Sequence, residues 1–385
     1  MVFKSIFVIV LAFLIFAFKQ YLNKDATDVL YDAQQQIEII TQENLLNSSG
    51  YLAREGWARH PFFIYSRDKI QGIKLGVKEW DYYMTISHTQ NFAVCVTISD
   101  LTYGGLMAIA YIDLENGTFY QVDTIKLFTL GKLGLSPTST TDMNVSYTDD
   151  TVSIKYEKKG ELRHIFAKSS KMKLPNNETG FEADIVAIQP SNVESMNIAT
   201  SWSTDRTCFY LNEKVNCMVS TGKVKLGKRE IDLDPDNSFT VLDWGRGKWT
   251  YKNTWYWSSA SGKIDGIKFG FNLGYGFTDR SPATENVLFY GDKVHKLNEV
   301  VFEIPTNEKG EYEYDKQIKV ESDDKRLNLV FTPIVDRSSN FNLLIIASNQ
   351  HQVFGRFSGK AVLDDGKEID VNDFLGFIEV VKNRY

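Results

Sequence analysis

The stretch from Asp243 to Tyr290 decides the fold, and its first part reads DWGRGKWTYKNTWYWSSASG over residues 243–262. Four of the protein's seven tryptophans lie in this stretch. Because successive side chains of a strand point to opposite faces, rings at every second position predict a strand with one aromatic face. The residues on that face are Trp249, Tyr251, Asn253, Trp255 and Trp257.

A second run, KFGFNLGYGF over residues 268–277, alternates even more sharply. It predicts a strand with rings on one face and with three glycines and Asn272 on the other. Glycine weakens a strand unless something must come close to the backbone. Two interpretations fit: a core of rings packed over a glycine groove, as in barrels, or a ligand cavity whose polar contacts are Asn253 and Asn272.

Residues 243–247 hold two glycines and are predicted to form a turn ahead of these strands. Asp243 and Arg246 would pair across the turn, and Trp244 would stack on the guanidinium. A buried pair of this kind fixes local geometry. In the alternative interpretation, Asp243 and Arg246 are an acid and a cation that face a ligand at the mouth of a pocket.

Length and composition bound the fold class. The protein has 385 residues, a formal net charge of −6 and 13% aromatic residues. The charge excludes a basic nucleic-acid groove, so no nucleic-acid partner is predicted. The aromatic content favours strands, and a single core stops growing beyond about 250–300 residues. We therefore predict an all-β protein of two antiparallel halves, residues 51–185 and 186–385.

The amino-terminal run Ser5–Phe18 is apolar after its first residue and is flanked by Lys4 and Lys19. As a helix it would cover roughly 21 Å of a bilayer core of about 30 Å, which snorkelling lysines extend to a short span. Because no small-x-small cleavage site follows, we predict an uncleaved signal anchor over residues 1–22 and thus a single-pass membrane protein. A cleaved signal peptide is the alternative.

The orientation in the membrane stays open because the charges on either side of the run nearly balance. A lumenal or extracellular body is compatible with the N-glycosylation sequons, although they do not settle the side. The sequons begin at Asn47, Asn116, Asn144 and Asn177. Residues 23–50 form a helical stalk in this prediction, because apolar residues recur at spacings of three and four up to Ile40.

Metal and cofactor chemistry is not indicated by the sequence. The five histidines are scattered, and no glycine-rich phosphate loop, Cys-x-x-Cys pair or nucleophile elbow is present. We predict no metal and no cofactor. Cys208 and Cys217 flank residues 212–214, a predicted hairpin turn, and are either reduced on neighbouring strands or paired in an oxidising compartment.

Three carboxylates lie in aromatic surroundings, namely Asp81, Asp243 and Glu285. Acid catalysis on an alkene or isoprenoid needs a protonated carboxyl in a dry pocket. These residues are therefore the candidates for a catalytic acid, and the alternative is that each is a structural hydrogen-bond acceptor.

The body resembles a family known only as domain of unknown function 2804. The matching motifs include GWAR (56–59), KEWDY (78–82), DWGRG (243–247), YKNTWYW (251–257), FNLGYG (271–276), TEN (284–286), FGRFSG (354–359) and GFIE (376–379). The resemblance implies no activity. More distantly the body is similar to two-domain lipocalin-like proteins of the carotenoid hydratase type, which implies tandem β-barrels that hold an apolar molecule.

Three functional hypotheses follow. The first is a membrane-tethered protein that binds a hydrophobic small molecule or lipid along the central aromatic stretch, with Trp249, Trp255 and Trp257 among the contacts. The second is a hydratase, cyclase or isomerase on an apolar substrate, with Asp243 or Glu285 as the acid. The third is a structural or interaction module with a filled core.

Overall fold

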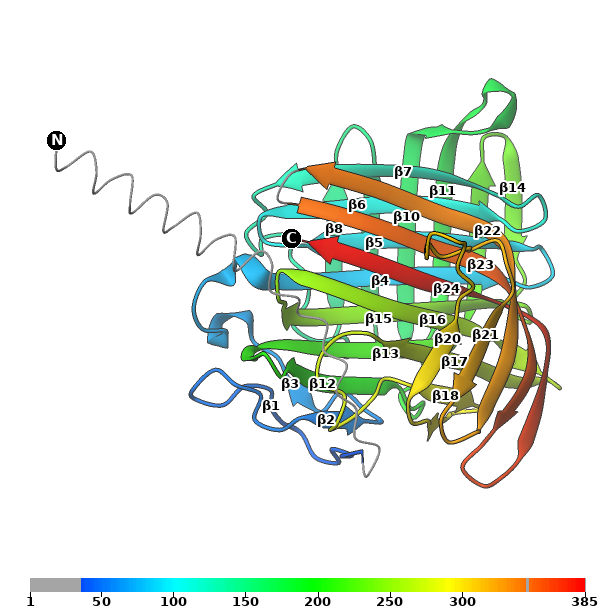
Figure 1. Ribbon diagram of the computed structural model, residues 1–385. Coiled ribbons are helices and arrows are strands. Elements are labelled where there is room, and N and C mark those ends of the chain that lie inside the picture. The colour runs from blue at the N-terminus through cyan, green and yellow to red at the C-terminus, as the bar shows by residue number, and fades with distance from the viewer. Residues whose placement is uncertain (1–35, 344–345, 385) are drawn as a thin grey trace.

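Most of the described chain, residues 36–343 and 346–384, is folded into β-strands in the computed structural model of the protein (Figure 1). The helical turns are the short 3-10 segments η1 (Arg67–Lys69), η2 (Lys74–Gly76) and η3 (Pro175–Asn177). The prediction of an all-β protein is confirmed. The predicted span Ser5–Phe18 lies outside the described residues, and within them no helix has the length and apolar character to cross a bilayer.

The larger of the two main sheets has 13 strands within the described residues. They are β2 (Gly56–Ala58), β4 (Val77–Ser87), β5 (Phe92–Asp100), β6 (Gly104–Asp113), β7 (Thr118–Leu127), β8 (Met143–Thr148), β9 (Ser153–Lys159), β10 (Leu162–Lys173), β11 (Thr179–Ile188), β12 (Met196–Trp202), β13 (Asp205–Leu226), β14 (Arg229–Leu233) and β15 (Ser238–Lys248). Its antiparallel path runs β7–β6–β5–β4–β15–β13–β11–β10–β9–β8. Strands β12 and β14 join at β13, and β2 joins at β12.

The second sheet has nine strands within the described residues and is also antiparallel. They are β16 (Lys252–Ile264), β17 (Ile267–Tyr275), β18 (Val287–Tyr290), β19 (Lys293–Lys296), β20 (Val300–Glu303), β21 (Ile318–Ser322), β22 (Leu327–Leu343), β23 (Ile346–Val362) and β24 (Glu368–Arg384). Their order is β19–β18–β17–β16–β24–β23–β22–β21–β20. A separate parallel pair is formed by β1 (Glu43–Asn44) and β3 (Phe63–Ile64).

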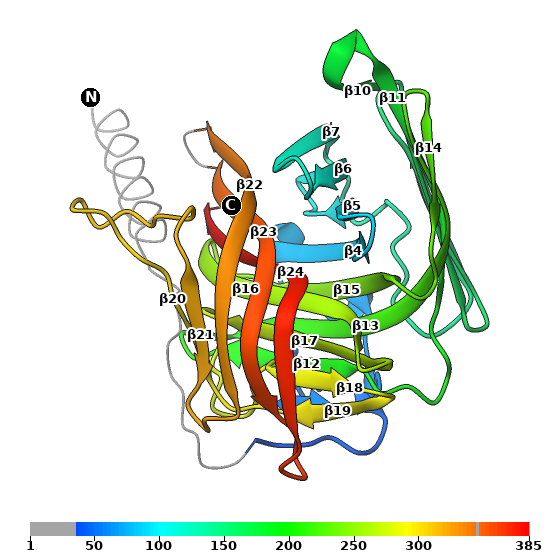
Figure 2. The same ribbon diagram turned by 90° about the vertical axis from the view of Figure 1, so that its right-hand side faces the viewer.

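Both sheets curl into half-barrels, which Figure 2 shows as two curved walls that meet along their middle strands. At one edge of the first sheet β7 approaches β10, and in the second sheet β20 approaches β17. The sheets pack against each other through β13 and β15 on one side and β16 and β17 on the other. Two curled antiparallel halves are therefore present, as the sequence predicts.

The chain passes from the first sheet to the second between Lys248 and Lys252. The predicted boundary between residues 185 and 186 falls inside β11, which pairs with β10 on one side and β13 on the other. Strand β13 is long enough to pair with four other strands, and this pairing keeps β12 to β15 in the first sheet. A division into separate folding units at 51–185 and 186–385 stays a prediction.

The alternation of side chains along the strands divides the core into three layers. Trp244 of β15 points into the first half-barrel, together with Leu242. Val241, the residue before Leu242, lies in the layer between the sheets, where it belongs to one cluster with Trp257. Phe271 belongs to the core of the second half-barrel. Each central strand therefore has two buried faces.

Strands β16 and β17 pair as the central sequence predicts, and their two sides have different neighbours. Phe269, Phe271 and Leu273 point into the second half-barrel, whereas the glycine side faces the first sheet. A Cβ on Gly270 would lie 2.8 Å from the Cys217 Sγ atom of β13, and one on Gly274 would lie 2.3 Å from Oε1 of Glu285. These glycines therefore permit the close approach of the first sheet and of Glu285.

The helical stalk predicted for residues 23–50 is wrong from residue 36 onward, and residues 23–35 lie outside the described chain. The backbone is extended here, because the Ile39 N–H group donates to the Trp57 carbonyl and the Ile37 N–H group donates to the Pro282 carbonyl. Ile39, Leu45 and Leu46 are buried in the first core, whereas Ile37 and Ile40 of the predicted helical face are exposed. Tertiary contacts have overridden a local helical spacing.

The turn predicted at residues 243–247 is also wrong, because these residues lie within β15. A Cβ on Gly245 would lie 2.0 Å from Cζ2 of Trp80. This glycine therefore makes room for an indole ring on the neighbouring strand and does not mark a turn.

The hairpin turn predicted at residues 212–214 is wrong as well, because these residues lie in the middle of β13. Cys208 and Cys217 are thus on one strand, and at about 3.3 Å per residue they are roughly 30 Å apart. A disulfide needs Cα atoms within about 7 Å. The two thiols therefore cannot pair with each other, and both are free.

Candidate functional site

The structure separates the predicted site residues into three groups. The layer between the sheets brings together Asp243, Glu285, Asn272, Trp257, Trp255 and Trp249. The interior of the first half-barrel holds Arg246 and Asp81. Tyr251 and Asn253 lie at the crossing from β15 to β16, where the Asn253 amide donates to the Thr250 carbonyl at 2.6 Å.

A buried lysine lies at the centre of the first group. The Nζ atom of Lys214 is 2.7 Å from Oδ2 of Asp243 and 3.9 Å from Oε2 of Glu285. The same atom lies over the ring of Trp257, 4.1 Å from its centroid. The side chains of Lys214, Asp243 and Glu285 are all less than 10% exposed. We call these three residues the central cluster.

Asparagine side chains fix the geometry of the central cluster. Asn212 on β13 donates to Oδ1 of Asp243 at 2.6 Å. Asn272 on β17 donates to Oε2 of Glu285 at 3.0 Å and accepts from Nε1 of Trp257 at 2.7 Å. Because Asn272 donates and accepts at once, its amide orientation is set, and it holds the indole and the carboxyl in one fixed arrangement.

Electrostatics in the cluster favour a proton on Glu285. Burial raises the pKa of the Glu285 carboxyl, and the neighbouring Asp243 acts in the same direction. Lys214 and the hydrogen bond from Asn272 oppose this shift. Two carboxyls share one lysine, and the shorter contact goes to Asp243. Glu285 is therefore the carboxyl of this cluster that is better placed to hold a proton.

An aromatic wall extends from the cluster toward the surface. The Trp249 ring centroid lies between 5.1 and 5.8 Å from those of five neighbours. They are Trp80, Trp202, Tyr210, Trp255 and Phe277. Trp80 and Trp255 are half-buried, so the outer end of the wall meets solvent. At the inner end, burial and the nearby Glu285 carboxyl raise the pKa of the Tyr210 hydroxyl.

A further carboxyl lies beside the aromatic wall. Trp255 donates from Nε1 to Oε1 of Glu379 at 2.9 Å, and Gln350 donates to Oε2 at 3.0 Å. Burial raises the pKa of Glu379. Its cross-strand partner on β16 is Trp257, so it lies on the same side of the second sheet as the central cluster.

Arg246 and Asp81 form an ion pair inside the first half-barrel. Arg246 donates from Nη2 to Oδ1 of Asp81 at 2.9 Å, and both side chains are fully buried. The guanidinium also donates to the Ser136 and Trp80 carbonyls and lies 4.2 Å from the Trp244 ring centroid. The predicted pair between Asp243 and Arg246 is wrong, because these residues point to opposite faces of β15.

Sequence reasoning missed Lys214, Glu379 and Tyr210. The sequence did hold a signal for Lys214. Asn212, Lys214 and Asn216 are polar and occur at every second position, which is the pattern of one face of a strand. This alternation was hidden by the assignment of residues 212–214 to a turn. Glu379 carries no local signal, since its role depends on the pairing of β24 with β16.

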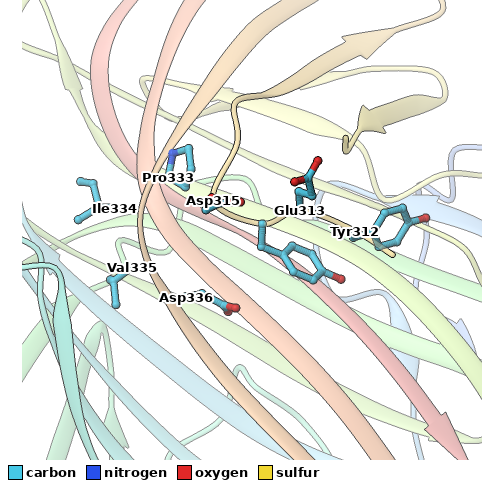
Figure 3. A pocket seen from close by; sticks show the side chains of 8 residues that line it. Tyr312, Glu313, Asp315, Pro333, Ile334, Val335 and Asp336 are labelled. Atoms are coloured by element: carbon cyan, nitrogen blue, oxygen red, sulfur yellow. The ribbon is translucent and has the colours of Figure 1, made fainter. Parts of the chain in front are cut away.

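A separate surface hollow of about 590 Å³ lies in the second half, beside the bend of β22 (Figure 3). Its lining residues are Tyr312, Glu313, Tyr314, Asp315, Pro333, Ile334, Val335 and Asp336. Next to it, the His351 ring stacks on Tyr314 and contacts Oδ2 of Asp336 at 2.7 Å. None of the residues predicted for the site belongs to this lining. Among the described residues, no group of three or more His, Cys, Asp or Glu side chains is placed to hold a metal ion.

Comparison with solved structures finds several chains with a similar arrangement of strands, including the three that follow. Kievitone hydratase from Nectria haematococca has a TM-score of 0.45 and 12% identity, over 84% of this chain and 93% of its own. CghA with Sch210972 has a TM-score of 0.47 and 7% identity, over 80% of this chain and 88% of its own. A protein assigned as AttH from Nitrosomonas europaea has a TM-score of 0.47 and 11% identity, over 84% of this chain and 98% of its own. Similarity at this level says nothing of a shared activity.

Comparison with sequences gives a family but no characterised relative. No curated protein matches the chain. A family model matches residues 36–385, and its description is domain of unknown function (DUF2804). The match covers every described strand, including the central stretch with its aromatic and glycine faces. The chain therefore belongs to the DUF2804 family.

Proposed function

We propose that this protein binds an apolar small molecule or lipid in the layer between its two sheets, and that the run Ser5–Phe18 tethers it to a membrane as a single-pass anchor. The observation that carries the binding proposal is the aromatic wall. It begins at the half-buried Trp80 and Trp255 and ends at the buried central cluster.

This arrangement has the chemistry of an apolar ligand site. Such sites are lined mainly by hydrophobic and aromatic side chains, with a few polar groups that fix orientation. When a ligand enters, rings of the wall would move apart and contact the ligand in place of one another. Burial of one such ring contributes about 2–3 kcal/mol. The polar end of the ligand would then meet Lys214 or Glu285.

The retention of buried charge supports the same proposal. Removing charges from water costs several kcal/mol per ion, and a buried ion pair is weak evidence for stability. Two carboxyls and one lysine between the sheets therefore cost free energy that apolar packing at the same place would not. Perturbed ionisable groups of this kind gather at functional sites.

The tether places the body beside a membrane that contains apolar molecules. All four asparagines of the glycosylation sequons, Asn47, Asn116, Asn144 and Asn177, are exposed. Each is therefore accessible to a glycosyltransferase if the body lies on the lumenal or extracellular side.

The binding proposal predicts a co-purifying apolar ligand. We expect native mass spectrometry and solvent extraction of the purified full chain to recover an apolar molecule in stoichiometric amount. Trp257→Ala should lose it, because this ring covers the Lys214 ammonium and shares a face of β16 with Trp255.

The matched control is Phe331→Leu, which perturbs the core of the second half-barrel away from the proposed site. This variant should keep the ligand. Recovery of no apolar molecule from the wild-type chain in several expression hosts would instead favour the third hypothesis, a packed structural module. In that case the hydrogen bonds among Trp257, Asn272 and Glu285 serve only packing.

A second candidate function is acid catalysis on an apolar substrate by a hydratase, cyclase or isomerase. The specific observation in its favour is the raised pKa of the buried Glu285 carboxyl. Asp243 is the weaker candidate because it contacts Lys214 at 2.7 Å. Asp81 is paired with Arg246 in the other half of the core.

Glu285→Gln tests whether Glu285 holds the proton. Because the folded state raises the pKa of this carboxyl, it binds the proton more tightly than the unfolded chain. The stability contributed by Glu285 is therefore fully present below its ordinary pKa of 4.5 and declines as pH rises through the folded value. In urea unfolding, we expect the variant to gain stability over the wild type between pH 4.5 and neutrality.

Two results bear on the acid role. Parallel stability curves for wild type and Glu285→Gln would show that Glu285 binds no proton on folding, and this would remove it as the acid. If turnover of the recovered ligand exists, the same variant should lower it by about 10²–10⁴-fold, the usual contribution of a general acid.

A further inference from the structure

One end of the first half-barrel exposes large apolar side chains. Six of them are between 51% and 77% exposed. They are Ile73, Leu75, Ile125, Leu127, Phe128 and Leu130, which we call the apolar rim. They belong to two segments, one around η2 and one at the end of β7, and an apolar group of this size in water normally marks a contact surface.

Hydrogen bonds to the β5–β6 turn hold the two segments of the rim together. The Phe128 N–H group donates to the Tyr103 carbonyl, and the Leu130 N–H group donates to the Thr102 carbonyl, both at 2.8 Å. The adjoining β5–β6 turn also touches η2, because the Nζ atom of Lys78 contacts the Leu75 carbonyl at 3.4 Å and the Leu101 carbonyl at 3.3 Å. All of these residues lie at the end where β4 begins and β7 ends, on the left in Figure 1.

Two residues of the rim are also strained. Phe128 and Leu130 have φ angles of 54° and 55°, in the left-handed region. Bulky residues rarely adopt this conformation, which glycine and asparagine tolerate best. Exposed positions in a turn also favour polar residues. Phe and Leu are therefore unfavourable here on both counts, which points to an environment other than water.

The surroundings of the rim are basic, although the protein as a whole has a net charge of −6. Residues 64–76 and 123–133 contain four lysines and two exposed acids, Asp68 and Asp123. The lysines are Lys69, Lys74, Lys126 and Lys132. Apolar side chains flanked by lysines match the interface of a bilayer with anionic headgroups.

We propose that the apolar rim docks on an anionic lipid bilayer, with Phe128 and Leu130 inserted at the headgroup level. A second copy of this chain fits less well, because a two-fold contact would bring the lysines of both rims together. The segment Ser5–Phe18 also fits less well, because it has no acid to meet these lysines. The rim contact builds on the proposed tether and fixes how the body lies against the membrane.

The test uses the full chain reconstituted into vesicles of phosphatidylcholine and phosphatidylglycerol. An environment-sensitive fluorophore is attached at Phe128→Cys or, separately, at Leu130→Cys. The three native cysteines are buried, so labelling falls on the new thiol. The matched control is Ile267→Cys, because Ile267 is also apolar and exposed but lies far from the rim. The nearby Lys263 forms an ion pair with Asp236, which precedes β15 at the end of that strand opposite to the rim. Quenching by nitroxide-labelled lipids is measured.

We expect several-fold stronger quenching at positions 128 and 130 than at position 267, and weaker quenching when phosphatidylglycerol is left out. If the chain floats with vesicles but the three positions are quenched alike, the rim contact is overturned and the tether stands. A blue-shifted label at position 128 that nitroxide lipids do not quench is covered by protein, and this also overturns the rim contact. A chain that does not float with vesicles overturns both.

Discussion

Lys214→Met is expected to lower the free energy of unfolding by about 3–5 kcal/mol, the typical cost of removing one partner from a buried ion pair. The substitution leaves Asp243 and Glu285 buried in the layer between the sheets without the ammonium group that contacts both. Methionine fills a similar volume, so the loss reports on charge and not on packing. Urea unfolding followed by tryptophan fluorescence measures it, because Trp257 lies over the Lys214 ammonium.

The matched control replaces all three ionisable groups of the central cluster. Lys214→Met combined with Asp243→Asn and Glu285→Gln should recover most of the lost stability, because no unpaired charge remains. If Lys214→Met alone unfolds at the urea concentration of the wild type, the central cluster is hydrated and open. That result would contradict the dry layer on which a raised pKa for Glu285 depends.

Arg246→Met is the other substitution for which we expect a loss of about 3–5 kcal/mol. It leaves Asp81 as an uncompensated charge inside the first half-barrel and takes donors away from the Ser136 and Trp80 carbonyls. One oxygen of Asp81 already has no hydrogen-bond partner among the described residues, so little local compensation is available. Thermal unfolding followed by circular dichroism measures the loss.

The double variant Arg246→Met with Asp81→Leu tests whether the two residues act as a pair. It should be clearly more stable than Arg246→Met, because the buried charge is gone. Arg246→Lys should fall between them, since it keeps the charge but loses the planar guanidinium over Trp244. Equal stability of the single and double variants would show that Asp81 is not the partner that Arg246 stabilises.

The alternating residues of the central stretch allowed much of the architecture to be predicted. Residues 252–264 and 267–275 are neighbouring strands, and Trp255 and Trp257 share one face of β16. The alternation of rings and glycines in β17 also has the predicted cause, a close approach to the backbone. These predictions succeeded because they use only the two-residue period of a strand, which is a local property.

Predictions from local sequence were wrong where contacts with residues distant in the chain decide the backbone conformation. Gly245 is predicted to lie in a turn, but it lies in a strand and leaves space for the Trp80 ring of β4. Residues 212–214 read as a hairpin tip, but they lie in a strand long enough to pair with four others. Residues 36–46 have helical spacing, but their backbone pairs with Trp57 and Pro282.

The sequence alone therefore determined that Trp255 and Trp257 share an aromatic face of β16 and that rings and glycines take opposite faces of β17. Trp249 and Tyr251, predicted on the same strand face, lie between the end of β15 at Lys248 and the start of β16 at Lys252. Only the tertiary structure decided what each face meets: Lys214 between Asp243 and Glu285 on one side of β15, and Arg246 beside Asp81 on the other. The physical reason is that face membership follows from backbone geometry within a few residues. Partners follow from the pairing of strands far apart in the chain, on which no local pattern reports.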